Sequence, residues 1–195
     1  DGNTVAIGAY SNDENGVNSG HVRIYAYNGS SWTKIGNDID GEASGDWSGY
    51  SVSLSSDGNT VAIGAPNNVG NGSSSGHVRI YNYNGTSWNQ LGNDIDGEAS
   101  GDECGNSVSL SSDGNTVAIG AHQNDGNGSL SGHVRIYNWS GTSWNQVGND
   151  IDGEAVWDMS GFSVSLSSDG NTVAIGAYLN DGNGNAAGHV RIYEI

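Results

Sequence analysis

Residues 48–66 decide the fold, and they read SGYSVSLSSDGNTVAIGAP. Their first half alternates polar and apolar residues, as a half-buried β-strand does. The Asp57-Gly58 pair that follows is typical of a tight hairpin turn. Residues 60–65 then place Val61 and Ile63 on one face of a second strand. This stretch therefore predicts a β-hairpin.

The hairpin belongs to a repeat that runs through the whole chain. The string DGNTVAIGA occurs four times at a spacing of 56 residues, starting at Asp1, Asp57, Asp113 and Asp169. GHVRIY follows each copy, starting at Gly20, Gly76, Gly132 and Gly188. The repeat units are residues 1–56, 57–112, 113–168 and an incomplete unit, 169–195. A fixed period of this size is typical of propellers and solenoids, whose units stack on their neighbours to bury their apolar faces.

Each repeat unit has the pattern of four short strands. One complete set of four is expected at residues 50–55, 60–65, 77–82 and 87–91. No segment has the periodicity of a helix, so we expect an all-β protein with no helix longer than about one turn. Four antiparallel strands per unit are typical of a β-propeller blade. A β-solenoid is the alternative, although its coils are usually shorter and lack tight Asp-Gly hairpins.

The same residues resemble the FG-GAP repeat of integrin-α-type β-propellers. Gly49 stands at the FG position, Gly64-Ala65-Pro66 is the GAP, and GHVRIY matches the strand that follows. The resemblance covers nearly the whole chain and implies a structural or adhesive module of a secreted or cell-surface protein. Integrin blades carry a DxDxDG calcium loop between their first two strands. A short Ser-Asp-Gly-Asn turn stands there in this chain, so that calcium site is not expected.

Composition excludes several classes of partner. The chain has 22 acidic residues and 5 Lys plus Arg, for a net charge of −17. Such a surface repels nucleic acid and anionic lipid, and it attracts Ca²⁺ or basic partners. No apolar run approaches the ~20 residues of a membrane span, so membrane insertion is not expected. The single cysteine, Cys104, excludes an intrachain disulfide, and Ser48 and Ser160 occupy its place in other copies.

The repeat count predicts an incomplete propeller. The sequence begins within one unit and ends within another, so the first blade lacks its innermost strand and the last lacks its outermost. Bare strand edges and uncovered blade faces are prone to aggregation. We therefore expect further repeats of the same polypeptide, or a second chain, to complete the propeller.

The junction between blades is the candidate metal site. Carboxylates stand there at positions 1, 3, 5 and 9, a spacing that oxygen-rich Ca²⁺ loops use. The twelve residues are Asp38, Asp40, Glu42, Asp46, Asp94, Asp96, Glu98, Asp102, Asp150, Asp152, Glu154 and Asp158. The Ca²⁺-loop glycine at position 6 and glutamate at position 12 are absent, and alternation along an exposed strand gives the same spacing. Two interpretations of these acids therefore remain, a Ca²⁺ site and acidic residues that simply face solvent. The Asn/Gly-rich loop at residues 124–128 is a second candidate Ca²⁺ site.

The HVRIY strand places His, Arg and Tyr on one face and Val and Ile on the other. Because the His and the Arg recur in every copy, we interpret them as contacts between blades. A buried Arg needs a carboxylate partner, and Asp46, Asp102 and Asp158 supply one per junction. A site for an anion or a sulfated glycan is the alternative.

Residues that differ between copies are the candidate ligand-binding residues. Tyr10, His122 and Tyr178 occupy one variable position at a loop start, and Trp47 occupies another at a blade junction. Exposed aromatic rings there would stack on a sugar, and neutral drift of surface residues is the alternative.

No nucleophile, base and acid stand together outside the repeats, so we expect no enzyme. Three functions remain. The first is an extracellular structural or adhesive module with a protein or cell-surface partner. The second is a lectin-like propeller that binds a glycan between blades. The third is an accessory domain of a larger secreted enzyme.

Overall fold

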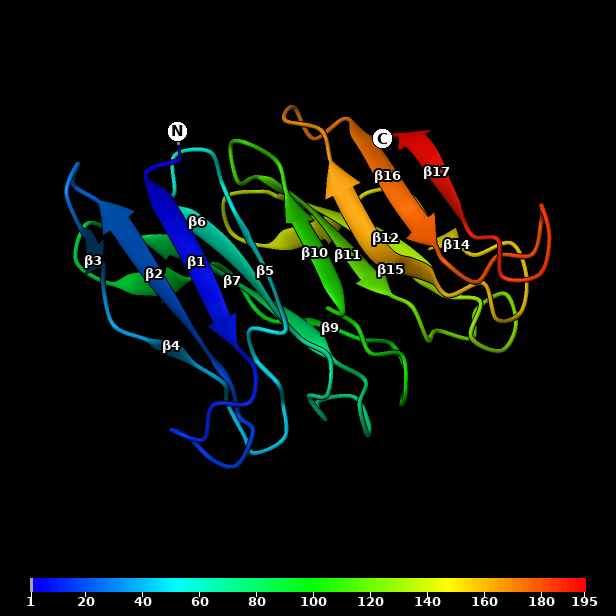
Figure 1. Cartoon of the computed structure of the whole chain (residues 1–195), viewed down its shortest axis with the longest axis horizontal. Coiled ribbons are helices and arrows are strands. Elements are labelled where there is room, and N and C mark those ends of the chain that lie inside the picture. The colour runs from blue at the N-terminus through cyan, green and yellow to red at the C-terminus, as the bar shows by residue number, and fades with distance from the viewer. Residues whose placement is uncertain (1) are drawn as a thin grey trace.

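The computed structural model describes residues 2–195 and contains only β-strands within them. The 17 strands form four antiparallel sheets, which follow one another in sequence order from the blue end of the chain to the red end (Figure 1). Each complete sheet combines a first strand from the end of one repeat unit with the strands of the unit that follows. The all-β prediction, with blades of antiparallel strands, is confirmed.

The second blade shows the complete pattern. It consists of β5 (Ser51–Leu54), β6 (Thr60–Ala65), β7 (His77–Tyr83), β8 (Trp88–Gln90) and β9 (Ile95–Asp96). The strand order is β5-β6-β7-β8, and β9 also pairs with β7. The fourth strand is therefore two short pieces, of which β8 pairs with one end of β7 and β9 with the other. The sequence predicted the first piece and not the second.

The other three blades follow the same plan. The first contains β1 (Thr4–Ala9), β2 (His21–Tyr27), β3 (Trp32–Lys34) and β4 (Ile39–Asp40). The third contains β10 (Ser107–Leu110), β11 (Thr116–Ala121), β12 (His133–Trp139), β13 (Trp144–Gln146) and β14 (Ile151–Asp152). The fourth contains β15 (Ser160–Leu166), β16 (Thr172–Ala177) and β17 (His189–Glu194). Within the described residues, the first sheet contains no equivalent of β5, and the last contains no equivalent of β8 or β9.

The Asp-Gly turn between the first two strands of a blade is held by its own side chains. Asp57 accepts hydrogen bonds from the Ser55 hydroxyl at 2.6 Å and from the Asn59 amide at 3.0 Å. These bonds favour the ionised form and lower the pKa of Asp57. Gly58 has a φ of +72°, a conformation that costs glycine little. The turn thus fixes the register of the hairpin.

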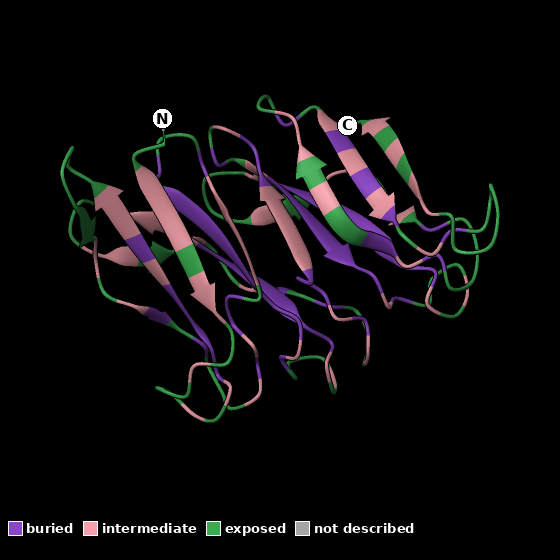
Figure 2. Cartoon of the chain, viewed as in Figure 1, coloured by how far each residue is buried: buried purple, intermediate pink, exposed green. Residues whose placement is uncertain are grey.

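The apolar core lies between the blades. Val78 and Ile80 of β7 pack in one cluster with Val117 and Ile119 of β11, and the other blade pairs repeat this arrangement. The blade face that carries Val78 and Ile80 therefore meets the following blade. The opposite face, which carries Arg79 and Tyr81 of β7, meets the preceding blade. In Figure 2 the strands of the two middle sheets are largely buried, whereas β1 and β17 carry exposed residues.

Candidate functional site at the blade seams

Arg79 joins the second blade to the first across the interface between them. Each interface between consecutive blades is called a seam, and the seams are numbered from the N-terminal blade. Nη2 of Arg79 donates a hydrogen bond of 2.8 Å to the carbonyl oxygen of Asp40, and its Nη1 lies 3.6 Å from Oε1 of Glu42. Arg135 repeats the arrangement at the next seam, 2.7 Å from the Asp96 carbonyl oxygen and 3.7 Å from Glu98. The predicted contact between blades is confirmed. The predicted partner was wrong, because the carboxylate beside the Arg is Glu42 and not Asp46.

Asp46 has a different role. Its buried Oδ2 accepts hydrogen bonds from the Ala43 amide at 3.0 Å and from Nδ2 of Asn68 at 3.1 Å. Asn68 lies in the loop of the second blade, so this bond also crosses the seam. Asp102 with Asn124, and Asp158 with Asn180, make the same contact. These three aspartates hold the loops of neighbouring blades together.

Cys104 is a structural residue of the second seam. The thiol is fully buried, and its Sγ lies 3.5 Å from Nη2 of Arg135. At the first seam the Ser48 hydroxyl lies 3.4 Å from Nη2 of Arg79. Burial raises the pKa of the Cys104 thiol to about 11, so it is neutral and a poor nucleophile at pH 7.

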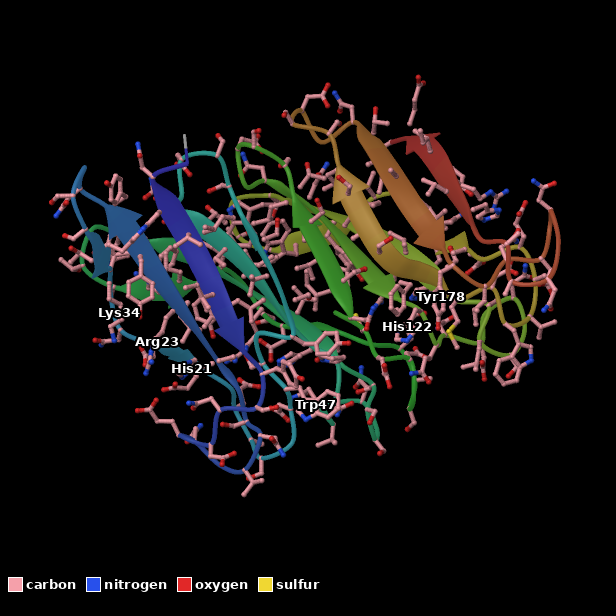
Figure 3. The ribbon with its side chains drawn as sticks, viewed as in Figure 1. His21, Arg23, Lys34, Trp47, His122 and Tyr178 are labelled. Carbon is pink, nitrogen blue, oxygen red and sulfur yellow. The ribbon has the colours of Figure 1, made fainter. Side chains whose placement is uncertain are left out.

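The structure separates the four carboxylates of each acidic junction. In the first junction Asp38 pairs with Arg23 at 2.8 Å and Lys34 at 2.6 Å, and these bonds lower its pKa to about 2. Figure 3 shows the His21, Arg23 and Lys34 side chains together beside the first sheet. With Asp46 held in its own contacts, no one centre contains all four residues. Calcium at the junction stays a prediction.

Carboxylates from consecutive junctions meet a histidine instead. Within the described residues, three groups have ligand atoms within 4.8 Å of one another, and each can hold a metal ion. The groups are Glu14, His21 and Asp40; Glu42, His77 and Asp94; and Glu98, His133 and Asp150. The remaining junction acids lie elsewhere. Glu154 contacts His189 and Arg191 at the third seam, and Asp96 lines a 330 Å³ groove with Tyr137 and Trp144.

The candidate ligand-binding residues gather in two aromatic clusters at the loop ends of the blades. In the first cluster the Tyr10 ring lies 5.7 Å from the Trp47 ring and 5.5 Å from the Tyr50 ring. In the second, the Phe162 ring lies 5.4 Å from His122 and 4.5 Å from Tyr178. Figure 3 shows Trp47, His122 and Tyr178 along one side of the molecule.

Tyr50 and Phe162 were not predicted as site residues. Both occupy one repeat position, where the second copy, residues 57–112, has Asn106, and both are exposed. Their difference from Asn106 is the same kind of signal that identified Tyr10 and Trp47. Comparing the copies at this position would have found them.

The backbone at the Trp47 position is left-handed in each copy that has it. The φ angles are 60° at Trp47, 54° at Glu103 and 52° at Met159. Glycine and asparagine are favoured in this conformation, and other residues cost about 1 kcal/mol there. The position nevertheless carries three large side chains that differ from one another. This pattern favours a role for those side chains beyond forming the turn.

The family comparison agrees with the blade boundaries. A family model described as the FG-GAP repeat matches residues 39–81 and 95–137. The chain contains FG-GAP repeats. Each match begins at the short outer strand of one blade and ends within the third strand of the next. An FG-GAP match therefore spans a seam, including its Glu and Arg. The comparison with curated proteins finds no match.

Two solved structures are similar to these FG-GAP blades. The Pseudomonas aeruginosa periplasmic gluconolactonase PpgL has a TM-score of 0.58 and 17% identity, over 98% of this chain and 49% of that one. A putative 6-phosphogluconolactonase from Bacteroides uniformis has a TM-score of 0.59 and 11% identity, over 89% of this chain and 44% of that one. The chain thus spans about half the length of the solved structures that it matches. At these identities the likeness shows the fold.

The expectation that the chain is not an enzyme is contradicted. It assumed that residues present in every blade serve only the blade, yet both similar structures are described as lactonases. A fold of this kind is therefore compatible with catalysis. The described residues contain no helix long and apolar enough to span a membrane.

Proposed function

We propose that the chain is an extracellular recognition module that attaches to a partner protein or cell surface through its two aromatic clusters. The observation that carries this proposal is the pairing of Tyr10 with Trp47 and of Phe162 with Tyr178 at the loop ends of the blades. Tyr and Trp contribute strongly to binding energy at protein interfaces because they bury a large area at a small entropy cost.

The exposure of the rings supports a binding surface rather than a core. Tyr10, Tyr50, Phe162 and Tyr178 are all exposed, in a chain whose apolar core lies between the blades. Exposed apolar rings lower the solubility of a protein, and a bound partner would cover them. The FG-GAP repeats and the net charge of −17 also suit a secreted protein, with Ca²⁺ at the acidic junction as part of this proposal.

Glycan binding is the second candidate function. A sugar ring presents a flat apolar face, and the exposed Tyr10 and Tyr178 rings offer surfaces on which it would stack. The neighbouring acids, such as Glu103 beside His122 at 3.7 Å, supply acceptors for sugar hydroxyls. Glu103 is partly buried, and this burial raises its pKa.

The two candidates are separated by arrays of glycans and of extracellular proteins, probed with the wild-type chain and with a Tyr10→Ala/Trp47→Ala double variant. Binding to defined proteins that the double variant loses supports the adhesive module, and binding to defined glycans that it loses supports the lectin. Binding that both chains share equally, or no binding to either array, would contradict the proposed role of the first cluster.

A further inference from the structure

We propose that the chain binds two Zn²⁺ ions, one at the seam between the first and second blades and one at the seam between the second and third. His77, Glu42 and Asp94 form the first site, and the second consists of His133, Glu98 and Asp150. In each site the Glu comes from the junction that follows one blade, and the His and Asp come from the next blade. A bound ion would join the two blades.

The histidine is the residue that points to a ligand. The side chain of His77 is only 2% exposed, and its Nδ1 lies 3.6 Å from Oδ2 of Asp94 and 3.9 Å from Oε2 of Glu42. Both distances are too long for hydrogen bonds. Nε2 of His77 is buried and has no hydrogen-bond partner among the described residues. Nε2 lies on the other side of the ring and would not contact an ion at this site. Nδ1 faces both carboxylates without a hydrogen bond to either, and an ion bound between them would give this nitrogen a partner.

The other oxygen of each carboxylate is already occupied, which orients the free oxygen toward the histidine. Gln90 donates a hydrogen bond of 2.6 Å to Oδ1 of Asp94, and Arg79 lies 3.6 Å from Oε1 of Glu42. Oδ2 and Oε2 are the atoms that face His77. Metal sites in proteins use such outer contacts to orient their ligands.

The second site repeats the first atom for atom. Nδ1 of His133 lies 3.7 Å from Oδ2 of Asp150 and 3.9 Å from Oε2 of Glu98. Gln146 donates to Oδ1 of Asp150 at 2.7 Å, and Arg135 lies 3.7 Å from Oε1 of Glu98. The same arrangement of ligand atoms therefore recurs at both of these seams.

The chemistry of the ligands selects Zn²⁺ over Ca²⁺. Imidazole is a ligand for Zn²⁺, whereas Ca²⁺ and Mg²⁺ are held by oxygen atoms. Four tetrahedral ligands with bonds of about 2.0–2.1 Å lie about 3.4 Å apart, within a few tenths of an ångström of the distances at His77. Burial lowers the pKa of both His77 and His133, which keeps the imidazoles neutral at pH 7 and able to bind a metal. The half-exposed Glu42 leaves a fourth position for water.

The group in the first blade, Glu14, His21 and Asp40, is less suited to a cation, which supplies a control within the chain. Lys34 stands where the other blades have Gln90 and Gln146, and with Arg23 it binds both oxygens of Asp38. The remaining group there depends on Glu14, whose Oε2 faces both His21 at 3.5 Å and Arg23 at 3.6 Å. A guanidinium so close to the only facing oxygen of Glu14 opposes a cation at that place.

Zn²⁺ titrated into the metal-free chain, with the bound metal measured after dialysis, tests the proposal. We expect two Zn²⁺ per chain, one in either Asp94→Asn or Asp150→Asn, and none in the double variant. Asp38→Asn is the matched control and should still bind two. Gln90→Ala should weaken one of the two sites roughly 10-fold. Circular dichroism of each variant shows whether it is folded, and the half-exposed Asp94 and Asp150 are chosen to preserve folding.

Binding of Zn²⁺ must also raise the thermal stability of the wild-type chain and not of the double variant. A stoichiometry other than two, a stoichiometry that Asp94→Asn leaves unchanged, or displacement of Zn²⁺ by equimolar Ca²⁺ would each overturn the proposal. Failure of these tests would not count against the proposed aromatic recognition surface, because the Zn²⁺ sites and the aromatic clusters share no residue.

Discussion

Gly64 and Gly105 meet backbone to backbone across a seam, and a Cβ atom on Gly64 would overlap the carbonyl oxygen of Gly105. Gly105 occupies the FG position of its blade, and Gly64 is the glycine of the GAP in the preceding one. Gly8 with Gly49, and Gly120 with Gly161, make the same approach. The two halves of the FG-GAP motif are thus joined in space between neighbouring blades.

Substituting Gly64 by Ala should destabilise the chain by roughly 2 kcal/mol, because the backbone of the next blade must move. Gly176 is the matched control, since it has a similar neighbour in its own blade, the Ser163 hydroxyl, and meets no following backbone. Urea unfolding of both variants measures the difference. A Gly64→Ala cost no larger than that of Gly176→Ala would show that the close approach does not limit stability.

Replacing Arg79 by Met should cost about 2 kcal/mol, because the carbonyl oxygen of Asp40 loses its donor in this part-buried contact. Arg23→Met in the first blade is the comparison. Its side chain is 39% exposed, against 6% for Arg79, so only a solvent-screened ion pair is lost and the cost should be smaller. Equal free energies of unfolding for the two variants would contradict the role of Arg79 in the seam.

His122 should make stability fall in mild acid. Burial lowers its pKa from 6.5 to about 4, so the folded state resists protonation more than the unfolded state does. The contribution of His122 to the free energy of unfolding is fully present above pH 6.5, where the imidazole is neutral in both states. It is lost as the pH falls from 6.5 toward 4, because the unfolded state takes up the proton first. Between pH 7.5 and 5, the wild type should lose roughly 1–2 kcal/mol more than His122→Gln. Parallel curves for the two proteins would exclude this effect.

The outer face of the last blade should mediate association. Ile192 is 70% exposed, whereas its equivalent Ile80 is 1% exposed beneath the next blade. We propose that further repeats or a second chain cover this face. If so, the chain alone should self-associate as its concentration rises, and Ile192→Lys should weaken that association about 10-fold. Val156→Lys, at another exposed apolar residue, should leave it unchanged. Light scattering that gives 20.0 kDa at every concentration would contradict the proposal.

The sequence predicted the blades because the repeat and the alternation within each strand depend on local residues. Val78 and Ile80 were placed correctly on one face by their spacing alone. The strand β9 was missed because two residues, Ile95 and Asp96, are too short to show a period.

Contacts across a seam were harder to predict, because they depend on how one blade is placed against the next. The sequence identified the Arg79 position and its need for a carboxylate, and it selected Asp46 when the partner is Glu42. The sequence likewise assigned acidic residues that are close together along the chain to the same candidate metal site. The structure combines Glu42 with Asp94 of the next junction, and the two are brought together by the seam.

The recognition role of the aromatic clusters is tested most directly by the affinity of Trp47→Ala for the strongest partner found on the arrays. Trp32 is the matched control, because it is exposed and contacts Tyr27 at 5.2 Å, outside both clusters. Surface plasmon resonance should give a Kd at least about 10-fold weaker for Trp47→Ala and unchanged for Trp32→Ala. An unchanged Kd for Trp47→Ala, or an equal loss in both variants, would contradict the account.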